Sequence, residues 1–251
     1  MSLFSAARIG VIVPSGNAAA EPEIAQLVGH RATAHTARFP TLPGRALRER
    51  LETYNAVLPQ VLAGFGNLAL DAAVVACSGS HYLLGVEQDR AFCTQLGDQA
   101  GFPVASSTLA ILDTCADLGI DTLTLASPYE PWLTELSAGY WTEAGLKVRQ
   151  VVPVRAGDRF SPYDVTPQEL VRQVEPAVPD DGSAVLFTGT GMFTFDALRV
   201  LGAGNDRVLL TSNVCSARWA LKHTGPGSEQ AEDGPWLLRR LAPGAVAGRS
   251  A

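Results

Sequence analysis

The sequence contains few of the residues on which metal and disulfide sites depend. Only four cysteines and four histidines occur in 251 residues. The cysteines form no CxxC pair and the histidines are scattered, so the spacing typical of zinc sites is missing. We therefore expect neither a bound metal nor a disulfide framework.

Long apolar runs and clusters of basic residues are also missing. Hydrophobic residues make up 47% of the chain, yet no unbroken apolar run approaches the length of a membrane span. The net charge of −6, without basic clusters, argues against nucleic acid as a partner. The first eight residues are too short and too weakly apolar for a signal peptide, so we expect a soluble, cytoplasmic protein.

The glycine motifs of nucleotide-binding proteins are incomplete here. Gly189-Thr-Gly191 resembles a fragment of a phosphate loop, but it lacks the lysine of a Walker motif and the full GxGxxG pattern. We therefore expect no nucleotide, and the sequence indicates no other cofactor.

One short apolar run ends abruptly at a thiol. Ala72 to Ala76 are uncharged, have valines at their centre and are too few for a helix, which predicts a strand covered on both faces of a parallel sheet. Cys77 follows at the carboxyl end, where such sheets bind ligands. A helix beginning near Ser80 would lower the pKa of the thiol and favour a bound anion. The alternative is that Cys77 is a small core residue.

Predicted strands and helices alternate along the chain, and their order repeats after Gly119. This pattern predicts an α/β protein of two similar Rossmann-like halves with parallel sheets, related by a pseudo-twofold axis, with the active site in the cleft between them. We divide the chain into residues 1–119, residues 120–224 and a poorly ordered tail, 225–251. Predicted strands cover 8–14, 31–39, 72–76, 103–107, 121–127 and 147–154, and the runs 183–191 and 207–213 are the strand-and-loop segments that repeat those around Cys77 and Val104. Predicted helices cover 21–28, 47–65, 87–100, 108–118, 131–144, 166–174 and 214–222.

Polar side chains gather where the predicted strands end. None of these loops carries an arginine or a lysine, so anion binding would depend on backbone N–H groups, hydroxyls and amides. For each serine the alternative is a turn or capping role, especially for Ser15, Ser107 and Ser212. Asn17 and Tyr129 are stronger candidates because they occupy corresponding ends of the two halves. The other candidates are Ser78, Ser80, Thr188, Thr190 and Asn213.

Three further cysteines and one histidine need a role. His81 follows Cys77 by four residues and is a candidate base for it, the alternative being an exposed or pocket-wall histidine. Cys215 is either an activated thiol at a helix start or a packing residue beside Trp219. Cys93 and Cys115 lie within predicted helices and are expected in the core.

These loops together resemble the aspartate/glutamate racemase superfamily, and within it the branch of maleate cis–trans isomerase and arylmalonate decarboxylase. The resemblance runs from Ile9 to about Gly225. It is carried by four segments, which are Val11-Ile-Val-Pro-Ser-Gly-Asn17 with Glu21-Pro-Glu23, Ala76-Cys-Ser-Gly-Ser80, Leu125-Ala-Ser-Pro-Tyr129 and Phe187-Thr-Gly-Thr-Gly-Met-Phe-Thr-Phe-Asp196.

The resemblance implies a cofactor-independent enzyme acting on a small dicarboxylate. Cys77 would be the nucleophile of a maleate-type cis–trans isomerisation, and Tyr129 would complete the catalytic pair. The implied substrate-binding residues are Pro14, Ser15, Asn17, Ser78, Gly79, Ser80, Thr188, Gly189 and Thr190. A homodimer is possible for this superfamily.

The sequence departs from the family pattern in the last of these segments. Isomerases and racemases of this superfamily carry a second cysteine there, and arylmalonate decarboxylases carry their single catalytic cysteine there. In this chain the matching position is Gly189, or Thr188 if the register slips by one. Two alternatives to an isomerase therefore stay open, which are an arylmalonate-type decarboxylase with Cys77 as proton donor and a non-catalytic dicarboxylate-binding relative.

Overall fold

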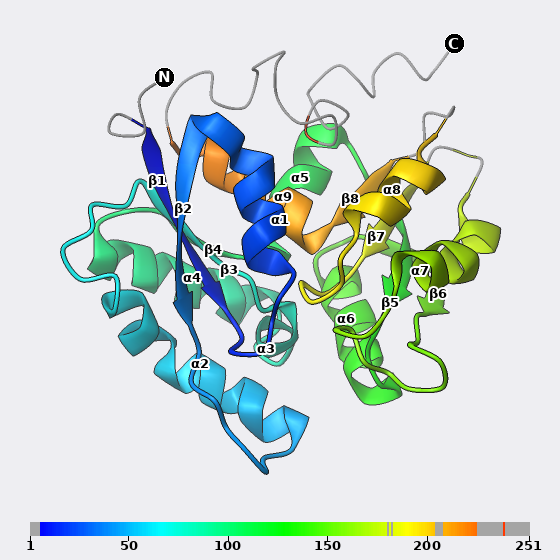
Figure 1. The fold of residues 1–251 in the computed structure, drawn as a ribbon, viewed down its shortest axis with the longest axis horizontal. Helices are drawn as coiled ribbons and strands as arrows, with labels where there is room; N and C mark the ends of the chain where they lie inside the picture. Colours follow the sequence, from blue (N-terminus) through cyan, green and yellow to red (C-terminus); the bar gives the residue numbers. More distant parts are fainter. Residues whose placement is uncertain (1–5, 180, 182, 204–207, 225–237, 239–251) are drawn as a thin grey trace.

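The computed structural model describes residues 6–179, 181, 183–203, 208–224 and 238 of the chain (Figure 1). Its strands form two parallel four-stranded sheets, ordered β2-β1-β3-β4 and β6-β5-β7-β8. Each strand of the second sheet thus takes the place of the strand four earlier in the first. The strands are β1 (Ala7–Val13), β2 (Ala32–Arg38), β3 (Ala72–Val75), β4 (Val104–Ser106), β5 (Thr122–Ser127), β6 (Lys147–Pro153), β7 (Ala184–Phe187) and β8 (Leu209–Thr211). The predicted α/β class with two parallel-sheet halves is confirmed.

Helices connect the strands and cover the sheets. The first half contains α1 (Ala20–Val28), α2 (Leu47–Ala63), α3 (Ser78–Tyr82), α4 (Val86–Ala100) and α5 (Ser107–Leu118). The second contains α6 (Pro131–Glu143), α7 (Pro167–Val174), α8 (Phe195–Leu201) and α9 (Ser212–Lys222). Short 3₁₀ turns at Gly29–Arg31 and Glu175–Ala177 follow α1 and α7. None of the described helices is both long and apolar enough to cross a bilayer.

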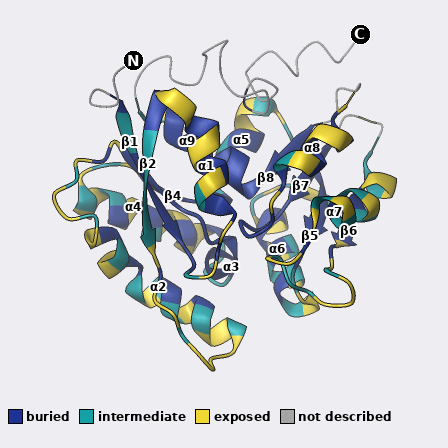
Figure 2. Cartoon of the chain, viewed as in Figure 1, coloured by how far each residue is buried: buried dark blue, intermediate teal, exposed yellow. Residues whose placement is uncertain are grey.

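Burial explains why the central strands have their composition. All four residues of β3 and all four of β7 are buried, as expected for strands covered on both faces. The edge strand β6 is mostly exposed, and its charged residues agree with that position. Figure 2 shows the buried central strands of the sheets and the exposed outer surface of helices such as α2.

Two short helices differ from the sequence-based prediction. α3 begins at Ser78, two residues earlier than expected, and spans only five residues. α8 was not predicted, because its seven residues are too few to show a clear helical period. Gly119 ends α5 in the left-handed conformation, with φ of 65°.

The last helix crosses between the two halves. α9 follows β8 of the second sheet, yet it packs against α1 and α5 of the first half (Figure 1). The division into residues 1–119 and 120–224 stays a prediction. The predicted tail, 225–251, lies outside the described residues apart from Leu238, which is buried.

Candidate active site

A pocket of about 300 Å³ lies where the strand ends of both halves meet. Its first-half wall comes from the end of β1, from α2 and from the β3–α3 junction. Its second-half wall comes from the β5–α6 junction, the loop before α7 and the loop after β7. The lining residues are Pro14, Leu47, Arg50, Leu51, Tyr54, Cys77, Ser78, Gly79, Pro128, Tyr129, Glu130, Leu133, Phe160, Ser161, Pro162, Tyr163, Thr190 and Gly191. This volume suits a small-molecule ligand.

Cys77 lies at the N-cap of α3, immediately after the fully buried strand β3. Its residue is only 4% exposed, and it lines the pocket. Burial raises the pKa of the Cys77 thiol, while the hydroxyl and backbone N–H of Ser80 lower it less strongly. The expectation of a lowered thiol pKa is therefore wrong, because removal from water outweighs the local donors.

Tyr129 reaches the pocket from the opposite half, just after β5. Its ring packs edge-on against Tyr82, with the ring centroids 6.4 Å apart. Burial raises the pKa of Tyr129 well above its ordinary value, and the nearby Tyr82, Cys77 and Tyr163 add to the effect. The Tyr129 hydroxyl therefore keeps its proton at neutral pH and can act as a hydrogen-bond donor.

Asn17 lies behind the pocket wall. Its Oδ1 accepts hydrogen bonds from the N–H groups of Ala19 and Ala20, and its Nδ2 donates to the hydroxyl and carbonyl of Thr190. The Thr190 hydroxyl in turn donates to the carbonyl of Ala76, at 2.8 Å. Asn17 thus joins the first-half loop to the pocket-lining Thr190, and a direct contact with substrate stays a prediction.

A buried carboxylate extends this link between the halves. Glu23 on α1 accepts hydrogen bonds from the backbone and hydroxyl of Thr194 and from Nδ2 of Asn213. Asn213 also donates to the carbonyl of Thr190, at 3.3 Å. Burial raises the pKa of Glu23, against the effect of these donors. The segment after β7 is therefore held by side chains of α1 and α9.

The structure separates the predicted site residues into two groups. Those that line the pocket are Pro14, Cys77, Ser78, Gly79, Tyr129 and Thr190. Those outside the lining are Ser15, Asn17, Ser80, Thr188 and Gly189. Ser80 donates its hydroxyl to the carbonyl of Cys77, and the buried Thr188 hydroxyl bonds that of Tyr82. These two side chains stabilise the loops that carry the lining residues.

The serines predicted as caps have a different role. Ser106 and Thr211, each one residue earlier, cap α5 and α9. Ser107 and Ser212 instead approach Ser78, with hydroxyl distances of 2.8 and 3.3 Å. The first residues of α3, α5 and α9 therefore meet beside the pocket.

Sequence reasoning missed the pocket residues that come from α2 and from the loop before α7. Leu47, Arg50, Leu51 and Tyr54 line the pocket, although α2 carries none of the predicted site residues. Their spacing of three and four residues places them on one helix face, and this is the signal that could have located them. The segment 160–163 carries no comparable signal.

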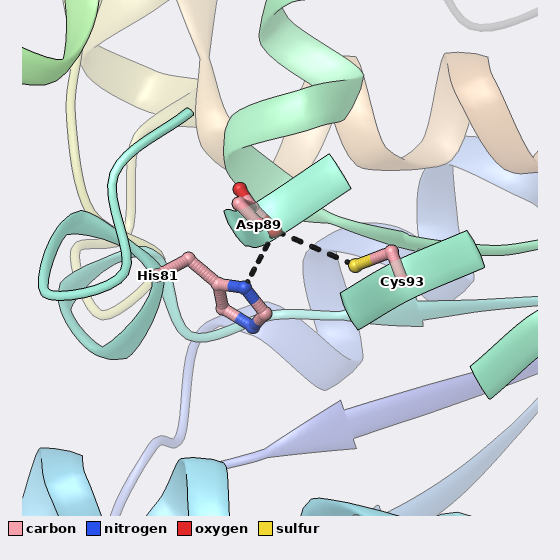
Figure 3. A group of neighbouring side chains, drawn as sticks. All are labelled: His81, Asp89 and Cys93. Carbon is pink, nitrogen blue, oxygen red and sulfur yellow. Dashed lines mark hydrogen bonds and ion pairs between the residues drawn. The ribbon is translucent and has the colours of Figure 1, made fainter. Parts of the chain in front are cut away.

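His81 belongs to a buried cluster. It is fully buried and outside the pocket lining, so the exposed or pocket-wall interpretation is wrong, and its role as a base for Cys77 stays a prediction. Its Nδ1 lies 2.8 Å from Oδ1 of Asp89. Figure 3 marks this contact with a dashed line. The other Asp89 oxygen accepts hydrogen bonds from Ser106, Thr108 and Tyr140. This network joins α3 and α4 to α6 of the other half.

The same cluster has the composition of a metal site. Ligand atoms of His81, Asp89 and Cys93 all lie within 4.8 Å of one another (Figure 3). Both Asp89 oxygens already accept hydrogen bonds, however, and burial together with Asp89 raises the pKa of the Cys93 thiol. A protonated thiol is a poor metal ligand, so we interpret the group as a hydrogen-bonded network.

The remaining cysteines are core residues. Cys93 and Cys115 are buried within α4 and α5, as predicted. Cys215 is fully buried in α9, and burial raises the pKa of its thiol to about 12. The packing interpretation of Cys215 is therefore the one that agrees with its surroundings. Among the described cysteines, Cys77 alone lines the pocket.

Comparison with known proteins gives the family. The family model described as arylmalonate decarboxylase matches residues 9–235. The chain belongs to the arylmalonate decarboxylase family. The resemblance of the strand-end loops to this branch is thereby confirmed.

Individual relatives of this arylmalonate decarboxylase family member include isomerases. A maleate isomerase of Alcaligenes faecalis is 25% identical over 194 residues, covering 72% of this chain and 76% of its own. The solved maleate isomerase of Pseudomonas putida has a TM-score of 0.78 at 22% identity, covering 87% of this chain and 92% of its own. A Nocardia farcinica maleate cis–trans isomerase mutant with a covalently bound succinylcysteine intermediate has a TM-score of 0.72 at 19% identity, covering 87% and 93%. The structural likeness extends over most of the fold.

Gly189, one of the two positions where the sequence was expected to depart from the family pattern, has an unusual backbone. Gly189 has φ of 87°, in the left-handed region that side chains other than glycine rarely adopt. A β-carbon at this position would also approach Tyr129. The backbone of this loop is therefore arranged for a residue without a side chain.

Proposed function

We propose that this protein is a cofactor-independent cysteine enzyme that converts a small cis-enedioate of the maleate type into its trans isomer. The observation that carries the proposal is the position of Cys77, which is the pocket-lining thiol of the described chain and lies opposite Tyr129. The maleate isomerase relatives, one of them with a succinylcysteine intermediate, support the same chemistry.

The reaction begins with the Cys77 thiolate. Its sulfur forms a bond to one alkene carbon, and the electron pair of the double bond moves onto the neighbouring carboxylate, which becomes an enediolate. The former double bond is now single, so the two halves of the substrate rotate about it. The electron pair then returns, the C–S bond breaks, and the thiolate leaves from the trans product. No proton is gained or lost overall.

The charge that develops on the enediolate needs donors. The first N–H groups of a helix have no intrahelical partner, and Ser78 and Gly79 of α3 place such groups on the pocket wall next to Cys77. The protonated Tyr129 hydroxyl supplies a further donor from the second half. Fixed donors of this kind stabilise developing charge without having to reorganise.

Tyr129 also takes over the place of the second thiol. The hydroxyls of Thr188 and Thr190, the nearest alternatives in that loop, are engaged with Tyr82 and with Ala76. The Tyr129 hydroxyl lies beside Gly189, which the resemblance matches, with Thr188 as the alternative, to the second cysteine of the isomerases. Among the described residues, Tyr129 is therefore the free hydroxyl on that side of the pocket, and it stabilises the enediolate as a hydrogen-bond donor.

Decarboxylation is the second candidate, and a specific observation favours it. The raised pKa of Cys77 keeps its proton on the sulfur at neutral pH, as a proton donor requires. In this reaction the C–C bond to one carboxylate of a disubstituted malonate breaks, carbon dioxide leaves, and the electron pair forms an enediolate. Cys77 then delivers its proton to the carbon.

Intact-mass spectrometry tests the proposal when it is run beside an NMR assay. The protein is incubated with maleate, while fumarate formation and release of carbon dioxide from phenylmalonate are followed. We expect fumarate together with an adduct that maps to Cys77, and neither in Cys77→Ser. Cys215→Ala is the control, because this buried cysteine lies outside the pocket lining.

The other outcomes separate the alternatives. Carbon dioxide release without an adduct would replace the isomerase by the decarboxylase. Binding of maleate that is retained in Cys77→Ser, with no turnover in the wild type, would identify a dicarboxylate-binding protein.

A further inference from the structure

Arg50 places a cationic side chain in the wall of the pocket. It lies on α2 between Leu47 and Tyr54, and all three residues line the pocket together with Leu51. Leu51 and Tyr54 are buried, so Arg50 shares a helix face that is otherwise apolar or aromatic. A charged residue on such a face requires a polar partner to offset the loss of water.

The protein itself does not provide that partner for the guanidinium Nε. This atom is buried and has no hydrogen-bond partner among the described residues. The neighbouring acids are directed elsewhere, because Glu49 accepts a hydrogen bond from the backbone of Ala46 and Glu130 accepts one from the indole of Trp132. A buried donor without an acceptor destabilises the unbound protein, and a ligand that supplies the acceptor removes that cost.

The charge of Arg50 affects the pKa of a neighbouring pocket residue, Tyr54. Burial raises the pKa of Tyr54, a charge on Cys77 raises it further, and Ser15 and Arg50 oppose the shift. The guanidinium and the Cys77 sulfur therefore act on the same phenol, from the same cavity. The pKa of Cys77 itself is raised by burial and lowered by Ser80.

A dicarboxylate leaves one charged group unassigned in the proposed reaction. The enediolate carboxylate is held by the α3 N–H groups and Tyr129, while the amide of Asn17 is engaged with Thr190. We infer that Arg50 binds the other carboxylate, on the carbon that takes the sulfur, and makes the pocket selective for substrates with two free carboxylates. The guanidinium fork matches a carboxylate in shape and charge.

This assignment also bears on the choice between the two reactions. Loss of carbon dioxide turns a charged carboxylate into a neutral molecule, so a cation bound to that group stabilises the ground state more than the transition state. In isomerisation the second carboxylate keeps its charge throughout, and Arg50 can hold it from binding to release. The inference rests on the proposed function and agrees better with the isomerase than with the decarboxylase.

Four proteins and two substrates test the inference. Wild type, Arg50→Gln, Arg50→Lys and Arg48→Gln are compared with maleate and with its monoamide, in which one carboxylate is replaced by a neutral group of similar shape. Arg48→Gln is the matched control, because it removes the same charge from α2 at a residue outside the pocket lining. The Arg48 guanidinium stacks on Trp132, 4.6 Å from the ring centroid. Binding of the unreactive diacid succinate is measured by calorimetry, and circular dichroism checks folding.

We expect Arg50→Gln to lower kcat/KM for maleate by about 10- to 100-fold, mainly through KM, the effect of losing one charge-assisted contact. The monoamide should change by less than about 3-fold, so that the preference for the diacid disappears. Arg50→Lys should recover part of the loss, and Arg48→Gln should behave as wild type. An unchanged KM for maleate in Arg50→Gln, or an equal loss on both substrates, would overturn the inference.

The succinate measurement keeps this result separate from the proposed function. If the wild type turns over no maleate but succinate binding weakens in Arg50→Gln and not in Arg48→Gln, the proposed reaction is wrong and the carboxylate site stands. If maleate is turned over and succinate binds equally to wild type and Arg50→Gln, the reaction stands and the role of Arg50 is refuted.

Discussion

The hydroxyl of Tyr129 lies only 2.6 Å from the point that a β-carbon would occupy at Gly189. Atoms at that separation overlap, so the tyrosine hydroxyl and a side chain at position 189 exclude one another. Any side chain at position 189, such as the second cysteine that the resemblance leads one to expect, and this orientation of Tyr129 are therefore alternatives. In this chain the sequence has glycine, and the tyrosine occupies the space.

Replacing Gly189 should therefore damage the site instead of restoring a second thiol. Gly189→Ala combines a left-handed backbone, at about 1–2 kcal/mol, with a steric overlap of about 1–3 kcal/mol. Gly145 is the matched control, because its φ of 88° equals that of Gly189 within a degree and nothing lies within 4 Å of its β-position. Urea unfolding should show a larger loss of stability for Gly189→Ala than for Gly145→Ala, and turnover should fall in Gly189→Ala alone. Equal losses in the two variants would show that Tyr129 is not in the way.

Tyr129→Phe tests the hydroxyl without removing the ring. The ring contact with Tyr82 remains, while one donor to the enediolate is lost. We expect kcat to fall by about 10²-fold and KM to change little, because the donor acts mainly in the transition state. Steady-state kinetics with maleate gives both constants. A rise in KM at constant kcat would instead assign Tyr129 to ground-state binding.

The pH dependence of turnover distinguishes the two reactions. Burial raises the pKa of Cys77 above the ordinary cysteine value of about 8.5. For an isomerase that needs the thiolate, kcat/KM should therefore rise about tenfold per pH unit between pH 6 and 8, and it should reach no plateau below the ordinary cysteine pKa. A decarboxylase that needs the protonated thiol should stay level over this range and slow only at higher pH. Profiles of kcat/KM in both assays separate these cases.

Asp89 is expected to stabilise the junction between the halves. Asp89→Asn leaves His81 and the hydroxyls of Ser106, Thr108 and Tyr140 without a carboxylate partner, and should lower the free energy of unfolding by roughly 3–5 kcal/mol. Urea titration measures this loss. Asp98→Asn on the same helix is the control, because Asp98 is exposed and its charge remains in water.

The Asp89 contribution should also depend on pH. Burial alone would raise the pKa of Asp89, but the charge and hydrogen bond of His81, with Thr108 and Tyr140, lower it overall. A folded-state pKa below the unfolded value of about 3.9 gives stability that is fully present above that value and is lost as pH falls through the folded value. The difference between wild type and Asp89→Asn should therefore shrink below about pH 4. A difference that stays constant down to pH 2.5 would contradict this account.

The strand pattern of this protein follows from local sequence. Apolar runs such as Ala72 to Ala76, bounded by polar turns, predicted buried parallel strands, and the repeat after Gly119 predicted the second sheet. The position of Cys77 at a strand end followed from the same run. These features depend on near neighbours in the chain, so the sequence carries them directly.

Only the tertiary structure decided which polar groups face the pocket. Asn17 and Thr188 follow strands at the edge of the sheet that faces the pocket. Each is nevertheless held behind the pocket wall by a side chain of the other half, Asn17 by Thr190 and Thr188 by Tyr82. Arg50 lies in α2, which carries none of the predicted site residues, and the packing of that helix brings it to the pocket. The tertiary structure also decided the thiol pKa of Cys77. The helix start beside the thiol predicted a lowered pKa, but burial raises it. Orientation and desolvation depend on residues distant in the chain, and no local pattern encodes them.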